Sequence, residues 1–595
     1  MTLNALRLAN FKAFGASQRI PLRPITLVFG ANSTGKSSLL HALALAHHAV
    51  GTGELDTQRT EIGGQAIDLG GFRQYVHRRA RERQVELGFE LDPERLSGRV
   101  AEFLRPARAV LVELAIGAGF ASEQRTLFGD ISRELDRSGG VRLERFALFV
   151  DGAQLLSMTA RPGGLLRLDR LDHRHPVFRE VFRGIVTLAT TTQDLHEEDF
   201  EGLGEVLDAL IPGITARPRG LFPRIEEEAD GQGREPSPAL IAVSRGRRRE
   251  DLARAARIFL PGALRDLVAG VASTVEEEIR RLRYLGPLRS YPPRHLAFSQ
   301  HHDPNWFAGG GYAWDVVRTR EQIRRRVNEW LGDPTRLKTP YELVVRELLT
   351  AEVITAELPP KVAKALHDLV VSLMRNLQGE AQLNLVALAD EVSHRLEETE
   401  EVGLLSEETI PEVEDLVTAT MDSEALAARW ARELVEARGE ALQDLVLIDK
   451  HTGTAVSHRD VGIGVSQVLP VLVSAYASDG MLVAIEQPEI HLHPALQAEL
   501  GDVFLESALR EQRNTFLIET HSEHLILRML RRIRETTDDE LPSGLPPVRP
   551  EDVSVLYVQP GREGAEVVHI PVTEEGEFER PWPEGFFAER ARELF

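Results

Sequence analysis

Apolar runs separated by polar and glycine-rich segments predict strands near both ends of this chain. Residues 25–29 are apolar and are followed by a glycine-rich loop and a helical pattern that continues to about Val50. Near the C-terminus, each apolar run precedes a loop and a helical pattern; these runs are 445–448, 481–485 and 515–518. Strands that alternate with helices are typical of a parallel sheet. The sequence therefore predicts an α/β fold whose parallel sheet is completed by the C-terminal third of the chain.

Shorter alternating runs predict a second, antiparallel sheet beside the first. Their apolar and polar positions alternate, as in strands with one buried face, at residues 85–89, 109–116, 143–150 and 164–168. From about residue 181 the pattern turns mainly helical. We therefore expect four segments: residues 1–180 with the loop and the antiparallel lobe, 181–440 as a mainly helical insertion, 441–540 with the remaining parallel strands, and 541–595 as a C-terminal strand segment.

The composition narrows the class of protein. The chain has 595 residues, of which 42% are hydrophobic and 27% charged, as in a folded protein of more than one domain. It contains no cysteine, which excludes disulfides, thiolate metal sites and cysteine nucleophiles. No apolar run has the length of a membrane span and no secretory signal is recognisable, so we expect a cytoplasmic protein without membrane contact.

The charge pattern bears on nucleic-acid binding. A net charge of −22 argues against a uniformly basic nucleic-acid-binding protein. Arginine-rich runs still leave room for a local basic surface; they occupy residues 73–83, 245–257, 280–294, 318–326 and 528–534. Each run alone is more typical of a solvated helix face. DNA therefore stays open as a partner.

The glycine-rich segment at residues 30–37 matches the phosphate-binding pattern GxxxxGK[ST] between a strand and a helix. Its backbone N–H groups would surround the phosphates, Lys36 would reach the β- and γ-phosphates, and the Ser37 hydroxyl would bind Mg²⁺. Lysine occurs only six times in the chain, so its presence here is informative. The residues expected at the nucleotide are Gly30, Asn32, Ser33, Thr34, Gly35, Lys36, Ser37 and Ser38.

Acidic and histidine residues follow two of the C-terminal strands. Glu486 ends the apolar run 481–485 and is predicted to hold Mg²⁺ with Ser37, because strand ends of a parallel sheet share one edge. Glu489 either serves the same site or caps the next helix. His521 follows the run 515–518 and is a candidate to contact the γ-phosphate or to orient a water molecule.

A second glycine-containing loop precedes an apolar helical pattern and includes Gly462, Gly464 and Ser466. Such a helix N-terminus is suited to an anion. One triphosphate does not need two such loops in one subunit. We therefore expect each copy of the chain to lend this second loop to the nucleotide of its partner.

The order of these motifs resembles that of the ABC-type ATPase heads of the SMC, RecF and OLD families, and most closely stand-alone bacterial AAA-type ATPases without a nuclease domain. The resemblance rests on segments 10–14, 284–289, 461–470, 486–494, 520–527 and 582–587. It implies an ABC-ATPase head, with a P-loop parallel sheet and an antiparallel β-lobe, interrupted by a large helical insertion. It also implies ATP and Mg²⁺ as ligands and an ATP-dependent homodimer.

The resemblance assigns roles to residues of this sequence. Lys12, in segment 10–14, joins the nucleotide contacts, and residues 30–37 are the Walker A loop. Residues 462–466 are the signature loop, Glu486 is the Walker B acid, residues 491–494 are the D-loop, and His521 is the switch histidine. Gln74 is a candidate for the Q-loop.

Two positions depart from the pattern of these families. Gly462 stands where the signature serine is usual, with Ser466 as a substitute further along, and Gln487 stands where the catalytic glutamate is usual. Glutamine cannot accept a proton from the attacking water as a carboxylate does. Either Glu489 or His521 therefore serves as the catalytic base, or hydrolysis is slow.

Two functions follow from these motifs. The first is an ATPase that controls a DNA-directed partner, a nuclease or another effector, in anti-phage defence or DNA repair. The alternative is an ATP-gated protein scaffold with little turnover and no DNA contact. The arginine runs favour the first, whereas Gln487 and the acidic charge favour the second. A P-loop kinase is disfavoured because it needs no second loop.

Overall fold

The structure of the protein is a computed structural model that divides the chain into two units. It describes residues 2–118, 120–125, 131–135, 140–189, 200, 204–225, 248–289, 305–334, 336, 339–348, 442–456 and 463–582. The first unit comprises Met1–Tyr291, His301–Thr339 and Val461–Phe595, and the second comprises Pro292–Gln300 and Pro340–Asp460. The motifs of the nucleotide site all belong to the first unit.

A nine-stranded antiparallel sheet forms the β-lobe of the first unit, with strand order β12-β11-β10-β9-β8-β5-β4-β1-β2. Its strands are β1 (Leu3–Ala9), β2 (Gln18–Pro21), β4 (Val85–Leu91), β5 (Val110–Ala118), β8 (Val141–Val150), β9 (Ala153–Ala160), β10 (Leu166–Leu171), β11 (Thr215–Arg219) and β12 (Phe222–Ile225). A separate hairpin pairs β6 (Phe120–Arg125) with β7 (Ile131–Leu135). The predicted antiparallel lobe is confirmed, since the four predicted runs correspond to β4, β5, β8 and β10.

The second sheet has the order β13-β17-β18-β3-β19-β20, and its first five strands are parallel. The strands are β13 (Leu282–Leu285), β17 (Leu482–Glu486), β18 (Thr515–Glu519), β3 (Ile25–Gly30), β19 (Val553–Gly561) and the antiparallel β20 (Gly564–Ile570). Every residue of β3, β17 and β18 is buried. Continuous apolar runs of this kind are typical of strands covered on both faces, and the prediction of a parallel sheet is confirmed.

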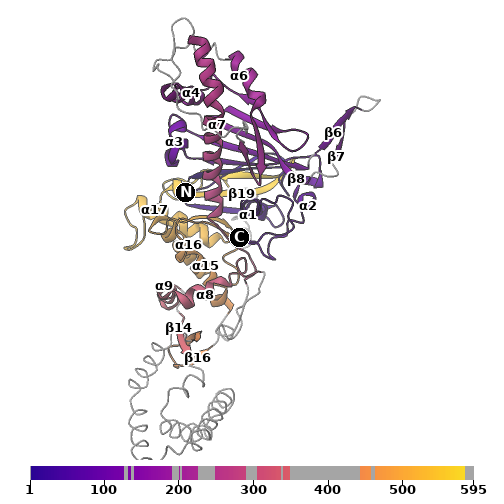
Figure 1. Ribbon diagram of the computed structural model, residues 1–595. Coiled ribbons are helices and arrows are strands. Elements are labelled where there is room, and N and C mark those ends of the chain that lie inside the picture. Colours follow the sequence, from indigo (N-terminus) through magenta and orange to yellow (C-terminus); the bar gives the residue numbers. More distant parts are fainter. Residues whose placement is uncertain are drawn as a thin grey trace, which may run out of the picture. The chain divides into compact units, whose positions relative to one another are not determined.

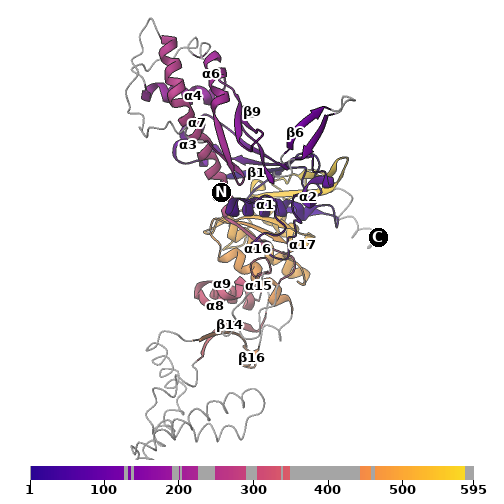
Figure 2. The same ribbon diagram turned by 45° about the vertical axis from the view of Figure 1, so that its right-hand side comes forward.

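Helices cover both faces of the parallel sheet (Figures 1 and 2). α1 (Lys36–Thr52) lies between the two sheets, where its leucines join the core formed with Phe89 and Val28. On the other face lie α15 (Ile463–Tyr476), α16 (Pro494–Leu509) and α17 (Glu523–Thr537). The further helices are α2 (Phe72–Tyr75), α3 (Gly98–Leu104), α4 (Pro176–Ala189), α6 (Gly204–Leu210), α7 (Arg248–Arg280), α8 (Tyr312–Thr319) and α9 (Glu321–Gly332).

In the part of the chain that the structure describes, one helix is long and apolar enough to cross a membrane. It is α7, over Glu250–Arg280. Side chains such as Leu260, Leu264 and Val271 are buried in the hydrophobic core, and α7 packs against α4 and α3. A core helix meets the same criteria of length and composition, so this finding is weak evidence for a membrane span.

Two parts of the structure differ from the prediction. The run 445–448 lies in β15 (Leu442–Asp449), which pairs with β14 (Tyr341–Leu348) and β16 (Ala455–Val456) in a small antiparallel sheet of the second unit, not in the parallel sheet. Residues 181–440 were expected to form a helical insertion, yet β11, β12 and β13 join the two main sheets. Strands of four or five residues carry too little pattern to be recognised beside a long helix. Residues 349–441 lie outside the described part.

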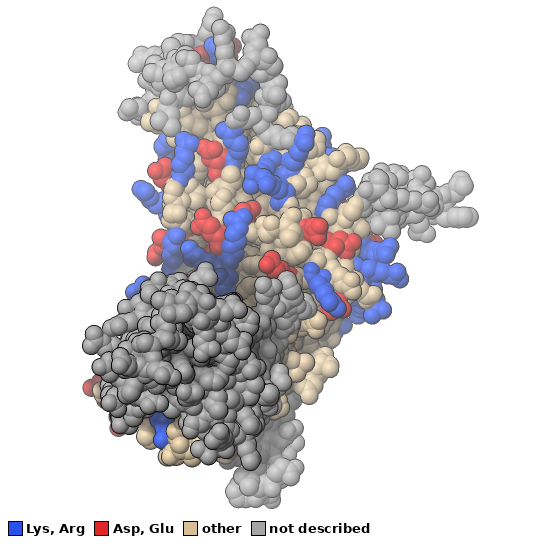
Figure 3. Space-filling view, turned by 60° about the horizontal axis from the view of Figure 1, so that its bottom comes forward, with Lys and Arg blue, Asp and Glu red and all other residues tan. Residues whose placement is uncertain are grey.

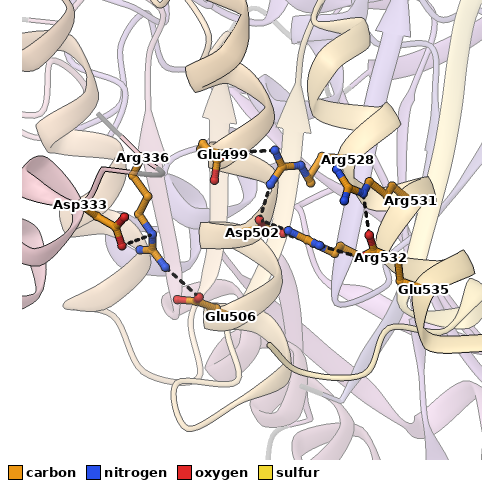
Figure 4. Close-up of polar contacts among 9 residues, drawn as sticks. All are labelled: Asp333, Arg336, Glu499, Asp502, Glu506, Arg528, Arg531, Arg532 and Glu535. Atoms are coloured by element: carbon orange, nitrogen blue, oxygen red, sulfur yellow. Dashed lines mark hydrogen bonds and ion pairs between the residues drawn. The ribbon is translucent and has the colours of Figure 1, made fainter. Parts of the chain in front are cut away.

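An ion-pair network joins α16 to α17 and explains one of the arginine-rich runs (Figure 4). Asp502 accepts hydrogen bonds from Arg532 at 2.8 Å and from Arg528 at 2.6 Å, and Arg528 also reaches Glu499 at 2.7 Å. Glu535 pairs with Arg532 and with Arg531, each at 2.6 Å. Arg528 and Arg532 therefore link α17 to α16, whereas the pairs with Glu535 lie within α17.

Other arginines of the predicted runs are also paired with acids. The pairs include Arg281–Glu278, Arg318–Asp315, Arg325–Glu321 and Arg326–Glu511. On the face drawn in Figure 3, acidic side chains lie among the basic ones. In the described part of the runs 280–294, 318–326 and 528–534, several arginines therefore have an acidic partner, at the surface in the first two runs and buried in the third.

Replacing Arg532 should destabilise the protein far more than replacing its neighbour Arg531. The Arg532 side chain is 7% exposed, and its loss leaves the buried Asp502 with one cation fewer, at a cost of roughly 3 kcal/mol. Arg531 is 56% exposed, and Arg531→Ala should cost less than about 1 kcal/mol. Urea unfolding of Arg532→Ala and Arg531→Ala measures the difference; equal losses would contradict the account of the network.

Candidate nucleotide site

The turn from β3 into α1 can be made only by glycine at two positions. Gly30 has φ 147° and Gly35, the N-cap of α1, has φ 103°. A Cβ on Gly35 would lie 2.4 Å from the Cβ of Ala13, and one on Gly30 would lie 2.4 Å from the carbonyl oxygen of Val558. The loop is therefore fixed between the 10–14 segment and β19. No side chain caps α1, and the N–H of Ser38 donates to the carbonyl oxygen of Gly35 at 3.0 Å.

Lys36 lies folded back over this loop. Its ammonium group donates to the carbonyl oxygens of Gly30 at 3.1 Å and Ala31 at 2.9 Å, and it lies 4.0 Å from a carboxylate oxygen of Glu519. Burial lowers the pKa of Lys36. A buried ammonium group beside a helix N-terminus that no side chain caps provides donors of the kind that a polyphosphate requires.

His521 lies at the same edge of the sheet, two residues after β18. Its Nε2 atom is buried and has no hydrogen-bond partner among the described residues. Burial and the nearby charge of Lys36 both lower the pKa of His521. The structure thus brings together the P-loop lysine and the predicted switch histidine, and the orphaned ring nitrogen fits a site that is completed by a ligand.

Ser37 donates its hydroxyl hydrogen bond to Glu519 at 2.7 Å, not to Glu486. Glu519 is the last residue of β18, the strand that lies between β3 and β17. Burial and the charge of Glu486 raise the pKa of Glu519 to about 7. Sequence reasoning missed Glu519, although the signal was the same as for Glu486: a buried strand that ends in an acid.

Glu486 contacts a different set of side chains. It accepts a hydrogen bond from the hydroxyl of Tyr284 at 2.8 Å, and Nε2 of His41 lies 3.5 Å from the same carboxylate oxygen. The ammonium group of Lys12 lies 2.6 Å from Nδ1 of His41. Burial lowers the pKa of Lys12 to about 8. Lys12, predicted at the nucleotide, is thus linked to Glu486 through His41. Neither Tyr284 nor His41 was recognised as part of this site.

Glu489 is built into the loop that carries His521. Its carboxylate accepts from the Thr520 hydroxyl at 2.8 Å and from the backbone N–H of His521 at 2.7 Å. Burial raises the pKa of Glu489. It does not cap the following helix, since the N-cap of α16 is His493, whose side chain accepts from the N–H of Ala495.

Gln487 occupies a left-handed backbone conformation with φ 46°. Its N–H donates to the carbonyl oxygen of Glu519 at 2.7 Å. The buried Arg289 donates to the carbonyl oxygens of Glu486 and Gln487, each at 3.2 Å. These contacts fix the end of β17 and stabilise a backbone conformation that residues other than glycine rarely adopt.

The second glycine loop is only partly described. Gly462 lies outside the described residues, while Gly464 and Ser466 lie in the first turn of α15. A Cβ on Gly464 would lie 3.4 Å from the carbonyl oxygen of His491, so the helix begins against the predicted D-loop. The side chain of Ser466 is 3% exposed. Its contact with the nucleotide of a second copy stays a prediction.

The oxygen atoms at this edge fit a magnesium–nucleotide complex. Within the described part, no three His, Asp or Glu side chains are grouped so that they could hold a metal ion alone. Ser37, Glu519 and Glu486 offer only hydroxyl and carboxylate oxygens, which Mg²⁺ prefers, and Mg²⁺ usually takes its other ligands from phosphates and water. The donor set therefore suits a cation that arrives with its nucleotide.

The family comparisons cover the C-terminal motifs. Residues 280–528 match the family described as "AAA domain, putative AbiEii toxin, Type IV TA system". Residues 548–595 match the family described as "Protein of unknown function (DUF3696)". A search of curated proteins finds no match.

Several similar solved structures are SMC heads. The SmcHead bound to the C-winged helix domain of ScpA is 10% identical, with 96% of this chain and 98% of that chain covered and a TM-score of 0.32. The SMC head domain from Thermotoga maritima is 8% identical, with 96% and 100% covered and a TM-score of 0.29. Scores this low carry no argument about the fold.

The assignment rests instead on the family match and on motifs that the fold gathers at one sheet edge. The P-loop, the strand-end acids and His521 come from both ends of the chain and meet beside α1. Over residues 280–528 the chain is similar to this AAA-domain family, and its P-loop and strand-end acids meet at one sheet edge as in ABC/AAA-type ATPase domains.

Proposed function

We propose that the protein binds ATP with Mg²⁺ at the P-loop and that ATP holds two copies of the chain together. The observation that carries the proposal is the loop itself, where Lys36 lies beside the N-terminus of α1, which no side chain caps, at one sheet edge. Phosphate oxygens are stronger acceptors for an ammonium group than the carbonyl oxygens of Gly30 and Ala31. Lys36 would exchange these carbonyls for the β- and γ-phosphates, and Nε2 of His521 would contact the γ-phosphate.

We propose further that hydrolysis is slow. Gln487 has no basic oxygen that can take the proton of an attacking water. Glu489 already accepts two hydrogen bonds from the loop that carries His521, which makes it a positioning residue for that histidine. ATP then acts mainly as a ligand that stabilises the assembled pair.

The second copy would be contacted through the start of α15. Gly464 lies against the 491–494 segment, so this helix N-terminus and the D-loop form one surface. A helix N-terminus favours an anion, and the nucleotide of one copy already has a phosphate loop of its own. The N-terminus of α15 is therefore suited to the γ-phosphate bound by a partner copy.

The partner controlled by this pair is proposed to be a protein effector, such as a nuclease, in the cytoplasm. Much of the charge in three arginine-rich runs is engaged in ion pairs, which favours a protein contact over direct DNA binding. The matching family description names a toxin–antitoxin system, and this supports a role in anti-phage defence over one in DNA repair.

Lys36→Ala should abolish measurable ATP binding, because it removes the ammonium group that contacts the loop at Gly30 and Ala31. Isothermal titration with ATP and Mg²⁺ measures the loss. Lys450→Ala removes a half-exposed lysine of the second unit and should leave the affinity unchanged. Wild-type affinity in Lys36→Ala would show that the nucleotide binds elsewhere.

Gln487→Glu should raise ATP turnover, toward the roughly 10²–10⁴-fold effect of a general base. Glu489→Gln should lower turnover by far less than that factor, because it loosens His521 without removing a base. Steady-state phosphate release at saturating ATP and Mg²⁺ measures both. If Gln487→Glu has no effect and Glu489→Gln is inactive, Glu489 is the base and the proposal of slow hydrolysis is wrong.

Gly464→Glu should prevent ATP-dependent dimerisation while ATP binding persists, because it places a bulky anion at the proposed contact with the partner's γ-phosphate. Light scattering with a non-hydrolysable ATP analogue reports the mass. Gly332→Glu is the matched control, since a Cβ there meets no atom within 4 Å. A Gly464→Glu protein that still dimerises with the analogue would exclude this surface.

A further inference from the structure

Two buried carboxylates lie side by side at the edge of the sheet that carries the P-loop. Glu486 and Glu519 are direct neighbours in the parallel pairing of β17 with β18. Their exposures are 6% and 4%. Neighbouring buried carboxylates repel each other and are costly to ionise unless a cation compensates them. A cation near the pair would therefore stabilise both carboxylates. The two carboxylates contact different side chains.

Glu486 is held on the side of β13 and the second turn of α1. The Tyr284 hydroxyl donates to its Oε1 at 2.8 Å, and Nε2 of His41 lies 3.5 Å from the same atom. Arg289 fixes the backbone at the same position through the carbonyl oxygen of Glu486. These contacts orient the carboxylate without using Ser37, the residue whose hydroxyl binds Mg²⁺ in P-loop ATPases.

Glu519 is held on the side of the P-loop. Its Oε2 accepts the hydroxyl of Ser37 at 2.7 Å, and its Oε1 lies 4.0 Å from the ammonium group of Lys36. The strand order explains the difference, because β18 is the direct neighbour of β3 whereas β17 is one strand further away. When Lys36 moves to a phosphate, Glu519 loses its nearest cation.

We propose that Glu519 is the carboxylate that binds the nucleotide-borne Mg²⁺ together with Ser37. Glu486 is then a positioning residue that Tyr284 and His41 hold beside it. The cation replaces the hydrogen bond between Ser37 and Glu519 and compensates the charge of both carboxylates. This inference rests on the proposed binding of Mg²⁺ and ATP at the P-loop, and it assigns the metal to an acid that the sequence motifs do not mark.

The experiment measures the affinity for Mn²⁺, a paramagnetic substitute for Mg²⁺, in the full-length protein saturated with a non-hydrolysable ATP analogue. Free Mn²⁺ is followed by electron paramagnetic resonance. Glu519→Gln keeps the size of the side chain and an acceptor for Ser37 but removes the charge, and it should weaken Mn²⁺ binding by about 10-fold or more. Glu486→Gln should weaken it clearly less.

Two further variants keep the test interpretable. Glu54→Gln alters a side chain that is 71% exposed and outside the site, and it should leave Mn²⁺ binding unchanged. Glu519→Asp retains the negative charge, but the shorter side chain places the carboxylate further from Ser37. Its Mn²⁺ affinity should therefore lie between those of wild type and Glu519→Gln. It also replaces Glu519→Gln if that variant fails to fold, as judged by circular dichroism.

The outcomes separate this inference from the proposed function. Binding of the analogue in EDTA should be the same for wild type and Glu519→Gln, because the inferred change concerns the metal alone. Wild-type Mn²⁺ affinity in Glu519→Gln, with the loss in Glu486→Gln instead, overturns the inference and leaves the proposed function intact. A wild-type protein that binds no analogue with or without Mn²⁺ overturns the proposed function itself.

Discussion

The hydrogen bond from Ser37 to Glu519 joins parts of the chain that are 482 residues apart, and the nucleotide site depends on the pairing that makes it possible. β18 is hydrogen-bonded to β3, so the strand that leads into the P-loop and the strand that leads into His521 end at the same edge. α1 then starts directly over the end of β18. Because β3 comes from the N-terminal part and β18 from the C-terminal part, the site forms only when both parts have folded into one sheet.

The same strand order distributes the charges of the site. Glu519 and Glu486 end neighbouring strands, and each has its own donors: Ser37 for the first, Tyr284 and His41 for the second. Glu489 holds the loop after β18 and so connects the end of β17 to His521. A nucleotide that attracts Lys36 would remove the ammonium group beside Glu519. Glu519 and Glu486 would then need another cation to compensate their charge. Metal, phosphate and histidine are coupled in this account through short buried contacts.

The sequence predicted those features whose signal is local. The P-loop needs only its glycines, Lys36 and Ser37 between an apolar run and a helix, and the strands β3, β17 and β18 are continuous apolar runs. Features that depend on tertiary neighbours were missed: Tyr284 comes from a strand of four residues, and His41 belongs to an apolar helix in which a histidine carries no pattern. Glu519 ends a buried strand as Glu486 does, and only the pairing of β18 with β3 brings it to Ser37. The sequence also did not predict which sheet β15 joins. That choice depends on its long-range pairing with β14, which no local pattern specifies.

A crystal structure of the protein with Mg²⁺ and a non-hydrolysable ATP analogue would show the site with its ligands. In it, the ammonium group of Lys36 should have left the carbonyl oxygens of Gly30 and Ala31 for the phosphates. Mg²⁺ should lie between Ser37 and Glu519, and the α15 of a second copy should begin at the γ-phosphate. A nucleotide bound away from the P-loop, or a cation on Glu486 with the bond between Ser37 and Glu519 intact, would contradict this arrangement.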